Sequence, residues 1–165
     1  MRVFLPATLS DVQRLLDDGQ WMPLGATGFA VTPALREAYT AGDDEELAEV
    51  AMRDAARASL RLLSADEEPD RPVRRVVIVA EDADATPRPD LDDAVVKVSG
   101  PIGKDAVVAV HVDGADAEPA VRKAVEVIDA ADLGDEDAEL AVGDAEDHDL
   151  GWYATQELPF LLELL

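Results

Sequence analysis

The chain has 165 residues and a mass of 17.6 kDa, and 37 acidic against 14 basic side chains give it a net charge of −23. Such a charge argues against binding to duplex nucleic acid or anionic lipid, because both need clustered lysine and arginine. The absence of cysteine excludes disulfides, zinc–thiolate sites and thiol catalysis. A hydrophobic content of 48% is typical of a chain that folds, and the length predicts one domain spanning residues 1–165.

The apolar periodicity predicts elements in the order β-α-α-α-β-β-β-α-β. In chain order they are a strand at 2–5, a helix ending at Gly19, a short helix from Pro33, a long helix at 45–63, strands at 73–80, 94–98 and 106–112, a helix at 116–130 and a strand at 150–157. Acidic or glycine- and proline-rich stretches between them are expected to be loops. These loops are 20–28, 64–72, 82–93 and 131–149, the last with a weak strand around 140–142.

Local signals support several of these boundaries. Pro6 is expected to end the first strand. Thr8 and Asp11 have the spacing of a capping box at the start of the first helix, and the pair Thr32–Pro33 is typical of a helix start. The two strands at 94–98 and 106–112 are expected to form a hairpin. The turn between them resembles a phosphate-binding loop, but the glycine spacing is too short and no helix follows, so we interpret it as a turn.

We predict an α+β fold with a mixed β-sheet of about five strands and helices packed on it. Without the additional helices and one strand, the element order has the split β-α-β pattern of ferredoxin-like folds. Right-handed crossovers would make some of the strands parallel. The sequence has no internal repeat with a period of 20–50 residues.

The long helix has a predicted cap at Asp43 and carries a row of arginines. Its inward face is expected to consist of Leu47, Val50, Ala51, Ala55, Ala58 and Leu62. Arg53, Arg57 and Arg61 follow Glu49 at intervals of four residues. The row is a candidate anion-binding site, to which Arg36, Arg74 and Arg75 could contribute. The alternative, which we favour, is internal pairing with acidic side chains such as Glu49.

Both histidines lie beside acidic residues. The alternation of the strand at 106–112 places Val107, Ala109, His111 and Asp113 on one face. His111 is therefore a candidate base or metal ligand, although a half-exposed histidine with a local hydrogen bond is the more common case. His148 lies in an acidic stretch, and the two could bind a divalent ion only if the fold brings them together. The aspartate-rich segments do not match the calcium-binding loop pattern, so no cofactor or metal is expected.

The C-terminus is unusually apolar for a chain end. Its candidate interface residues are Trp152, Tyr153, Phe160, Leu161 and Leu164. Such an end either docks on its own domain or contacts another subunit.

Four stretches of the chain resemble a family of short actinobacterial proteins of unknown function. These stretches are Met1–Thr8, Phe29–Arg36, Ala55–Arg61 and Leu150–Leu158. The resemblance implies a bacterial cytoplasmic protein of similar length, and it brings no activity, cofactor or catalytic residue. A cytoplasmic location is also expected because no apolar run is long enough for a signal peptide or a membrane span.

Three functions remain open. The first is a non-enzymatic domain that binds a protein partner or itself, as a homodimer through the apolar C-terminus. The second is an enzyme or a small-ligand or anion-binding protein that uses Arg53, Arg57 and Arg61 together with His111. The third is an acidic mimic of nucleic acid that occupies a basic protein. The absence of catalytic signatures favours the first.

Overall fold

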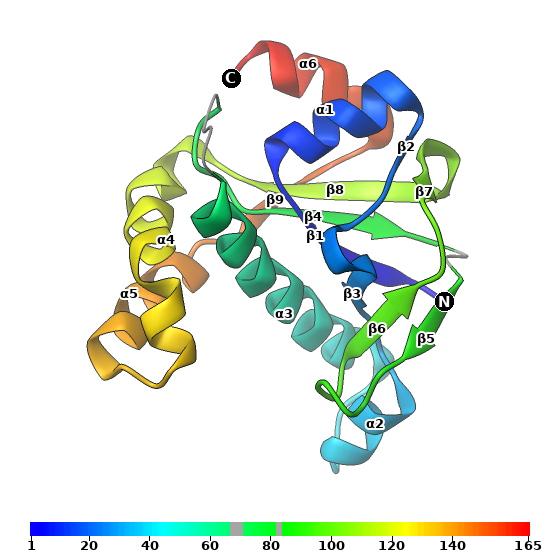
Figure 1. Cartoon of the computed structure of the whole chain (residues 1–165), viewed down its shortest axis with the longest axis vertical. Helices are drawn as coiled ribbons and strands as arrows, with labels where there is room; N and C mark the ends of the chain where they lie inside the picture. The colour runs from blue at the N-terminus through cyan, green and yellow to red at the C-terminus, as the bar shows by residue number, and fades with distance from the viewer. Residues whose placement is uncertain (67–70, 82–83) are drawn as a thin grey trace.

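The computed structural model describes residues 1–66, 71–81 and 84–165, and these form an α+β fold, as predicted (Figure 1). The strands are β1 (Val3–Ala7), β2 (Gln20–Trp21), β3 (Thr27–Phe29), β4 (Val76–Ala80), β5 (Ala85–Pro87), β6 (Val95–Val98), β7 (Ile102–Gly103), β8 (Val107–Asp113) and β9 (Leu150–Tyr153). The helices are α1 (Leu9–Asp18), α2 (Pro33–Ala38), α3 (Asp44–Ala65), α4 (Glu118–Asp132), α5 (Glu136–Glu146) and α6 (Leu158–Glu163). Short 3₁₀ turns cover Leu24–Ala26, Lys104–Ala106, Ala115–Ala117 and Thr155–Glu157.

The main sheet has seven strands in the order β5-β6-β3-β1-β4-β8-β9, and β2 pairs separately with β7. Every neighbouring pair is antiparallel, so the predicted mixed sheet of about five strands is wrong in strand number and direction. The split β-α-β pattern explains the difference. Strands β3 and β4 are parallel to each other and are joined through α2 and α3, but β1 lies between them and is antiparallel to both.

Helices cover both faces of the sheet (Figure 1). On one face, α1 and α6 pack over alternate residues of the central strands, including Leu5, Ile78 and Val110. On the other face, α3 lies against the sheet with Ala51 and Ala55, whose small side chains permit the close approach that the sequence predicts. The C-terminal half of α3 also packs against α4 and α5, so these two helices form a third cluster outside the sheet.

Pro6 lies inside β1 rather than at its end. Strand β1 pairs with β4 along all five of its residues, whereas its pairing with β3 is confined to Phe4 opposite Phe29. A proline is compatible with a strand where the missing N–H faces no ladder partner. The continuous pairing with β4 therefore continues through Pro6, and the predicted end at this residue is wrong.

Three predicted loops contain regular structure. Strand β2 and the first two residues of β3 lie within 20–28, β5 lies within 82–93, and α5 occupies much of 131–149 in place of the expected loop and weak strand. Asp135 caps the start of α5, and its carboxylate accepts the N–H of Ala138. Its buried side chains, Ala138, Ala141, Val142 and Ala145, recur at helical spacing among acidic residues. The many acidic residues around these four side chains make the apolar periodicity of this helix hard to recognise in the sequence.

The predicted hairpin between β6 and β8 is wrong. Strand β6 pairs with β3 and β5, while β8 pairs with β4 and β9, so the two strands are separated by three others. The connection between them contains β7, where Ile102 pairs with Trp21 of β2 and packs in the core beneath α1. The segment that the sequence suggested was a simple turn therefore forms part of a second, two-stranded sheet.

The long helix begins as predicted, since the Asp43 side chain accepts the N–H of Glu46. It continues to Ala65, two residues beyond the expected end. Leu47, Ala51 and Ala55 are buried as expected, but Val50, Ala58 and Leu62 are only half-buried, and the other buried positions are Ala56, Ser59 and Leu60. The inward face shifts because α4 and α5 pack on a second side of the helix. Of the predicted linker 64–72, residues 67–70 lie outside the described part of the chain.

Candidate functional site

The last strand of the sheet, β9, exposes a large aromatic side chain. Trp152 lies opposite His111 of β8 and is 60% exposed. Among the residues that the structure describes, β9 has a neighbouring strand on one side only, so its other edge is open. Strand β9 carries no charged side chain. Native proteins usually protect such edges with charge, proline or a covering element.

Helix α6 follows β9 and presents two further exposed apolar side chains. Leu158 and Leu161 are buried in the core beneath α1, which anchors the helix to the domain. Phe160 and Leu164 are 68% and 86% exposed. They are four residues apart, so they lie on the same outer side of the helix. One side of α6 thus docks on its own domain, and the other side stays exposed.

Of the five residues predicted for an interface, Trp152, Phe160 and Leu164 are exposed. The other two residues predicted for an interface serve the domain itself. Tyr153 is half-buried against the core beneath α1, and Leu161 is buried within it. The alternation of β9 accounts for this division, because Trp152 and Tyr153 must point to opposite faces of the sheet.

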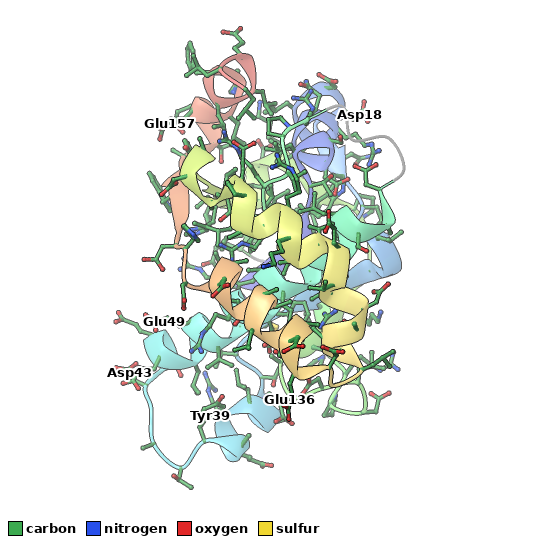
Figure 2. All side chains as sticks on the ribbon, turned by 90° about the vertical axis from the view of Figure 1, so that its left-hand side faces the viewer. Asp18, Tyr39, Asp43, Glu49, Glu136 and Glu157 are labelled. Atoms are coloured by element: carbon green, nitrogen blue, oxygen red, sulfur yellow. The ribbon has the colours of Figure 1, made fainter. Side chains whose placement is uncertain are left out.

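The arginine row does not act as a unit. Arg57 forms ion pairs with Asp132, Glu139 and Glu146, at 3.1, 2.6 and 3.5 Å, and Arg61 binds Asp132 at 2.7 Å. These acids belong to α4 and α5, so the pairing is internal as favoured, but its partners come from distant helices rather than from Glu49. Figure 2 shows α4 and α5 crossing in front of the domain, and the labelled acidic side chains distributed around the molecule.

Arg57 and the acids around it have perturbed pKa values. Hydrogen bonds to Glu139 and Asp132 raise the pKa of Arg57. The hydrogen bond from Arg61 is the largest cause that lowers the pKa of Asp132, and the one from Arg57 lowers the pKa of Glu139. The charges of Arg57 and Arg61 are therefore committed to holding α4 and α5 against α3.

Arg53 is different, because it lines a cavity of about 390 Å³ together with His111 and His148. Within the described ranges of the chain, no ion pair of Arg53 is formed. Burial lowers the pKa of His111 and so favours the neutral imidazole. The apolar part of the wall consists of Met52, Ala56 and Leu150, and Glu49, Glu146 and Asp149 line the rest together with Arg75.

The cavity thus brings together both histidines and one member of the predicted arginine row. No group of three or more histidine or acidic side chains in the described part of the chain has an arrangement that could hold a metal ion. His111 does not share its face with Val107 as predicted. A register shift in the pairing of β8 with β4, between Val79 and Ala80, turns Val107 toward α1 and α6.

Arg75 forms a buried ion pair beside this cavity. Its guanidinium binds both carboxylate oxygens of Asp113, at 2.9 and 2.7 Å, and also donates to the backbone oxygen of His148. The two side chains are 2% and 0% exposed. Arg36 and Arg74, the other predicted helpers of the anion site, pair with Asp44 and Glu118. Sequence inspection missed the role of Asp113, although its place directly after a buried strand was visible.

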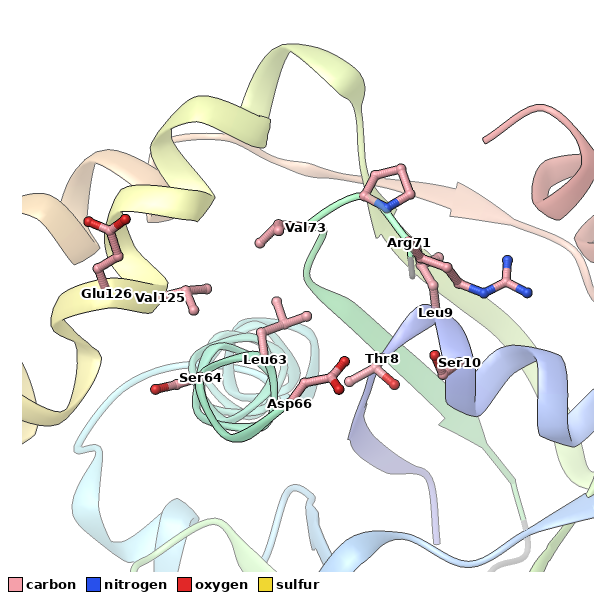
Figure 3. Close-up of a pocket in the computed structure, with 11 residues that line it drawn as sticks. Thr8, Leu9, Ser10, Leu63, Ser64, Asp66, Arg71, Val73, Val125 and Glu126 are labelled. Carbon is pink, nitrogen blue, oxygen red and sulfur yellow. The ribbon is translucent and has the colours of Figure 1, made fainter. Parts of the chain in front are cut away.

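A second cavity, of about 360 Å³, lies between the start of α1, the end of α3 and the segment before β4 (Figure 3). Leu63, Val73 and Val125 give it an apolar interior. Figure 3 shows the side chain of Arg71 extending away from these residues, and its guanidinium donates to Gln13 of α1. Asp66, Arg71 and Glu126 also line this cavity.

Comparison with known proteins identifies the family. The sequence matches the family described as "Family of unknown function (DUF6912)" over residues 1–162, and the chain belongs to that family. No curated protein and no solved structure matches it. No helix in the ranges that the structure describes is long and apolar enough to cross a membrane.

Proposed function

We propose that this member of a family of unknown function is a non-enzymatic protein-binding domain of the bacterial cytoplasm. The observation that carries the proposal is the open edge of β9 with the exposed Trp152 on it. Tryptophan is enriched at the centres of protein interfaces, where it supplies a large apolar area together with an N–H donor. Phe160 and Leu164 are also exposed, on α6, which packs on the other face of the sheet from Trp152.

Charge restricts the kind of contact that this surface can make. At −23, the domain repels duplex nucleic acid and anionic membranes, so we expect neither as a partner. Strand β9 itself is uncharged and offers backbone N–H and C=O groups. An extended segment of a protein can pair with such an edge through main-chain hydrogen bonds.

The experiment is a capture assay with matched surface variants. Tagged wild-type chain, Trp152→Lys and Leu133→Lys are each produced together with the untagged chain in the native host. Leu133 is 90% exposed at the end of α4 and serves as the control for a lysine placed on an apolar surface position. We expect the wild type and Leu133→Lys to retain the same protein, at least tenfold above Trp152→Lys. Equal retention by all three would contradict the proposal.

A second candidate function is binding of a small anion in the cavity lined by Arg53 and His111. The convergence of these two residues on one cavity favours it, whereas Arg57 and Arg61 cannot take part because their charges are paired. Calorimetric titration with inorganic phosphate and with succinate tests it. Binding that Arg53→Met abolishes and Arg61→Met preserves would support this function. Absence of heat with either anion would remove both as ligands.

A further inference from the structure

We infer that the partner of β9 is a second copy of this chain, paired antiparallel across a two-fold axis that passes between the two Gly151 residues. The inference rests on the proposed function and specifies its partner and register. Four observations carry it: the direction of the backbone groups of β9, the symmetry of an antiparallel pair, the face that Trp152 occupies, and the distribution of charge.

The backbone direction follows from one hydrogen bond at the end of β8. Asp113 donates its N–H to Arg75, so its backbone groups face β4. Successive residues of a strand face opposite neighbours, so Val112 faces β9, and its partner Gly151 faces β8. The N–H and C=O groups of Leu150 and Trp152 consequently point away from β8, in the plane of the sheet, toward the open edge of β9.

Symmetry then limits the register. When two identical strands pair antiparallel, the two-fold axis is perpendicular to the sheet, so the same face of both copies lies on the same side. The axis passes between one residue and the same residue of the second copy, which lie directly opposite each other. An axis at Gly151 places Leu150 of each copy opposite Trp152 of the other copy. Each of these two residue pairs allows two main-chain hydrogen bonds, so the register allows four. An axis at Trp152 would instead place Leu150 opposite Ala154. The N–H and C=O of Ala154 are already bonded to Glu157, so that register offers fewer bonds.

The side chains fit the axis at Gly151. Leu150 packs with the cluster beneath α3, and Trp152 lies on the same face, opposite His111. Each exposed Trp152 ring would therefore cover Leu150 of the second copy. Residues opposite each other without hydrogen bonds approach most closely, to about 4.5 Å between Cα atoms, and glycine at this position has no side chain to obstruct the approach.

Charge favours this arrangement despite the net charge of each copy. Residues 150–153 are uncharged, and Asp149 falls opposite Tyr153 of the second copy rather than opposite an acid. The other end of the sheet is unsuited to the same contact, because β5 has three residues and ends in Pro87, which has no N–H to donate. Because each copy has only one β9 edge, pairing through this edge stops at a dimer. The contact area is small, so we expect dissociation in the range of about 1–100 µM.

Cysteine substitution tests the register directly, because the chain contains no cysteine of its own. A Cβ at Gly151 would lie 3.5 Å from the backbone oxygen of Val112 and 3.6 Å from the Tyr153 ring, which are ordinary contacts, so Gly151→Cys should fold. At the axis, the two cysteines fall within the Cα separation of disulfides, which is about 4.4–6.8 Å. Trp152→Cys tests the alternative axis, and Leu133→Cys measures random cross-linking.

We expect Gly151→Cys to form a disulfide-linked dimer at least tenfold faster than the other two variants under mild oxidation. Faster cross-linking by Trp152→Cys, or equal rates for all three, would overturn the register. Sedimentation of the wild type tests the dimer separately from its register. A dimer without Gly151→Cys cross-linking removes only the register. A monomer up to 500 µM removes the second copy as partner, while the capture assay still decides whether the surface binds another protein.

A measurement on the unmodified chain complements the variants. Amide hydrogen exchange should be slow at Gly151 at every concentration, because its N–H faces β8. At Trp152 the N–H faces outward, so its protection should rise at least fivefold between 10 and 500 µM. Concentration-independent exchange at Trp152 would contradict pairing through β9.

Discussion

Arg75 and Asp113 form the buried ion pair that joins β4, β8 and the segment before β9. Removing one member of such a pair leaves an uncompensated charge inside the protein, at a cost of about 3–5 kcal/mol. We therefore expect Asp113→Ala to lower the free energy of unfolding by that amount in urea titration. The double variant Asp113→Ala/Arg75→Met should lose less than the sum of the single losses. Additive losses would show that the two side chains act independently.

Asp54 illustrates the opposite case, a carboxylate whose charge opposes folding. Burial and the neighbouring Asp92 raise the pKa of Asp54 above its ordinary value. A carboxyl whose pKa is raised by folding stabilises the native state at low pH and loses that contribution as pH increases. Asp54→Asn should accordingly raise the melting temperature at pH 7 by about 2 °C, and this gain should disappear near pH 3. Thermal melts at both pH values check it, and Glu49→Gln on the same helix is the control.

At the scale of elements, Arg57 is the main polar link between α3 and the pair α4–α5. The pKa values of Asp132 and Glu139 are lowered in the folded state, so their stabilising contribution is present above about pH 4.5 and is lost as pH falls. We expect Arg57→Met to lose about 1 kcal/mol at pH 7, as for a small network of partly exposed pairs. The difference from wild type should shrink between pH 5 and 3.

Arg53→Met provides the matched control for Arg57→Met, because Arg53 lies one turn earlier on α3 and forms no ion pair among the described residues. Its stability should stay within about 0.5 kcal/mol of the wild type at both pH values. Urea titrations across the pH range measure all three chains. A pH-independent loss in Arg57→Met would indicate that the side chain acts through packing rather than through charge.

The same scale shows what the sequence could predict. The caps at Thr8, Thr32 and Asp43 agree with the prediction, because each depends only on a side chain that bonds to the amide three residues further on. Strands β2, β3 and β5 were missed, because two or three residues gain a strand conformation only from a distant partner. Helix α5 was missed since its four buried residues are mostly alanine among acids, and what buries them is the packing against α3 and α4.

For the whole molecule, the candidate surface was predictable and the cavity was not. An apolar chain end with a tryptophan is visible in the sequence, and the structure adds that Tyr153 and Leu161, two of its five predicted interface residues, pack in the core. The cavity joins Arg53 of α3, His111 of β8 and His148 from the segment between α5 and β9, and only the order of strands in the sheet brings them together. The regular spacing of Arg57 and Arg61 suggested a shared site with Arg53, but helical spacing carries no information about the acids that α4 and α5 supply.

The net charge of −23 governs how the whole molecule responds to salt. An accessible surface of 8763 Å² leaves about 380 Å² for each net charge, and hence a mean spacing of roughly 20 Å. The screening length is about 30 Å at 0.01 M salt and about 8 Å at 0.15 M, so neighbouring charges repel across the surface only in dilute buffer. Screening also weakens the ion pairs of Arg57 and Arg61, but these few contacts are outnumbered by repulsive neighbours.

The melting temperature should therefore rise by about 5 °C between 0.01 and 0.15 M potassium chloride, since relieved self-repulsion favours the compact state. The dimer should tighten over the same range, because each copy carries the same charge and β9 pairs without any ion pair. Calorimetry and sedimentation measure the two effects. Tetramethylammonium chloride distinguishes screening from cation binding, and it should reproduce both changes. A rise that occurs only with potassium would instead locate a specific cation site in the acidic surface.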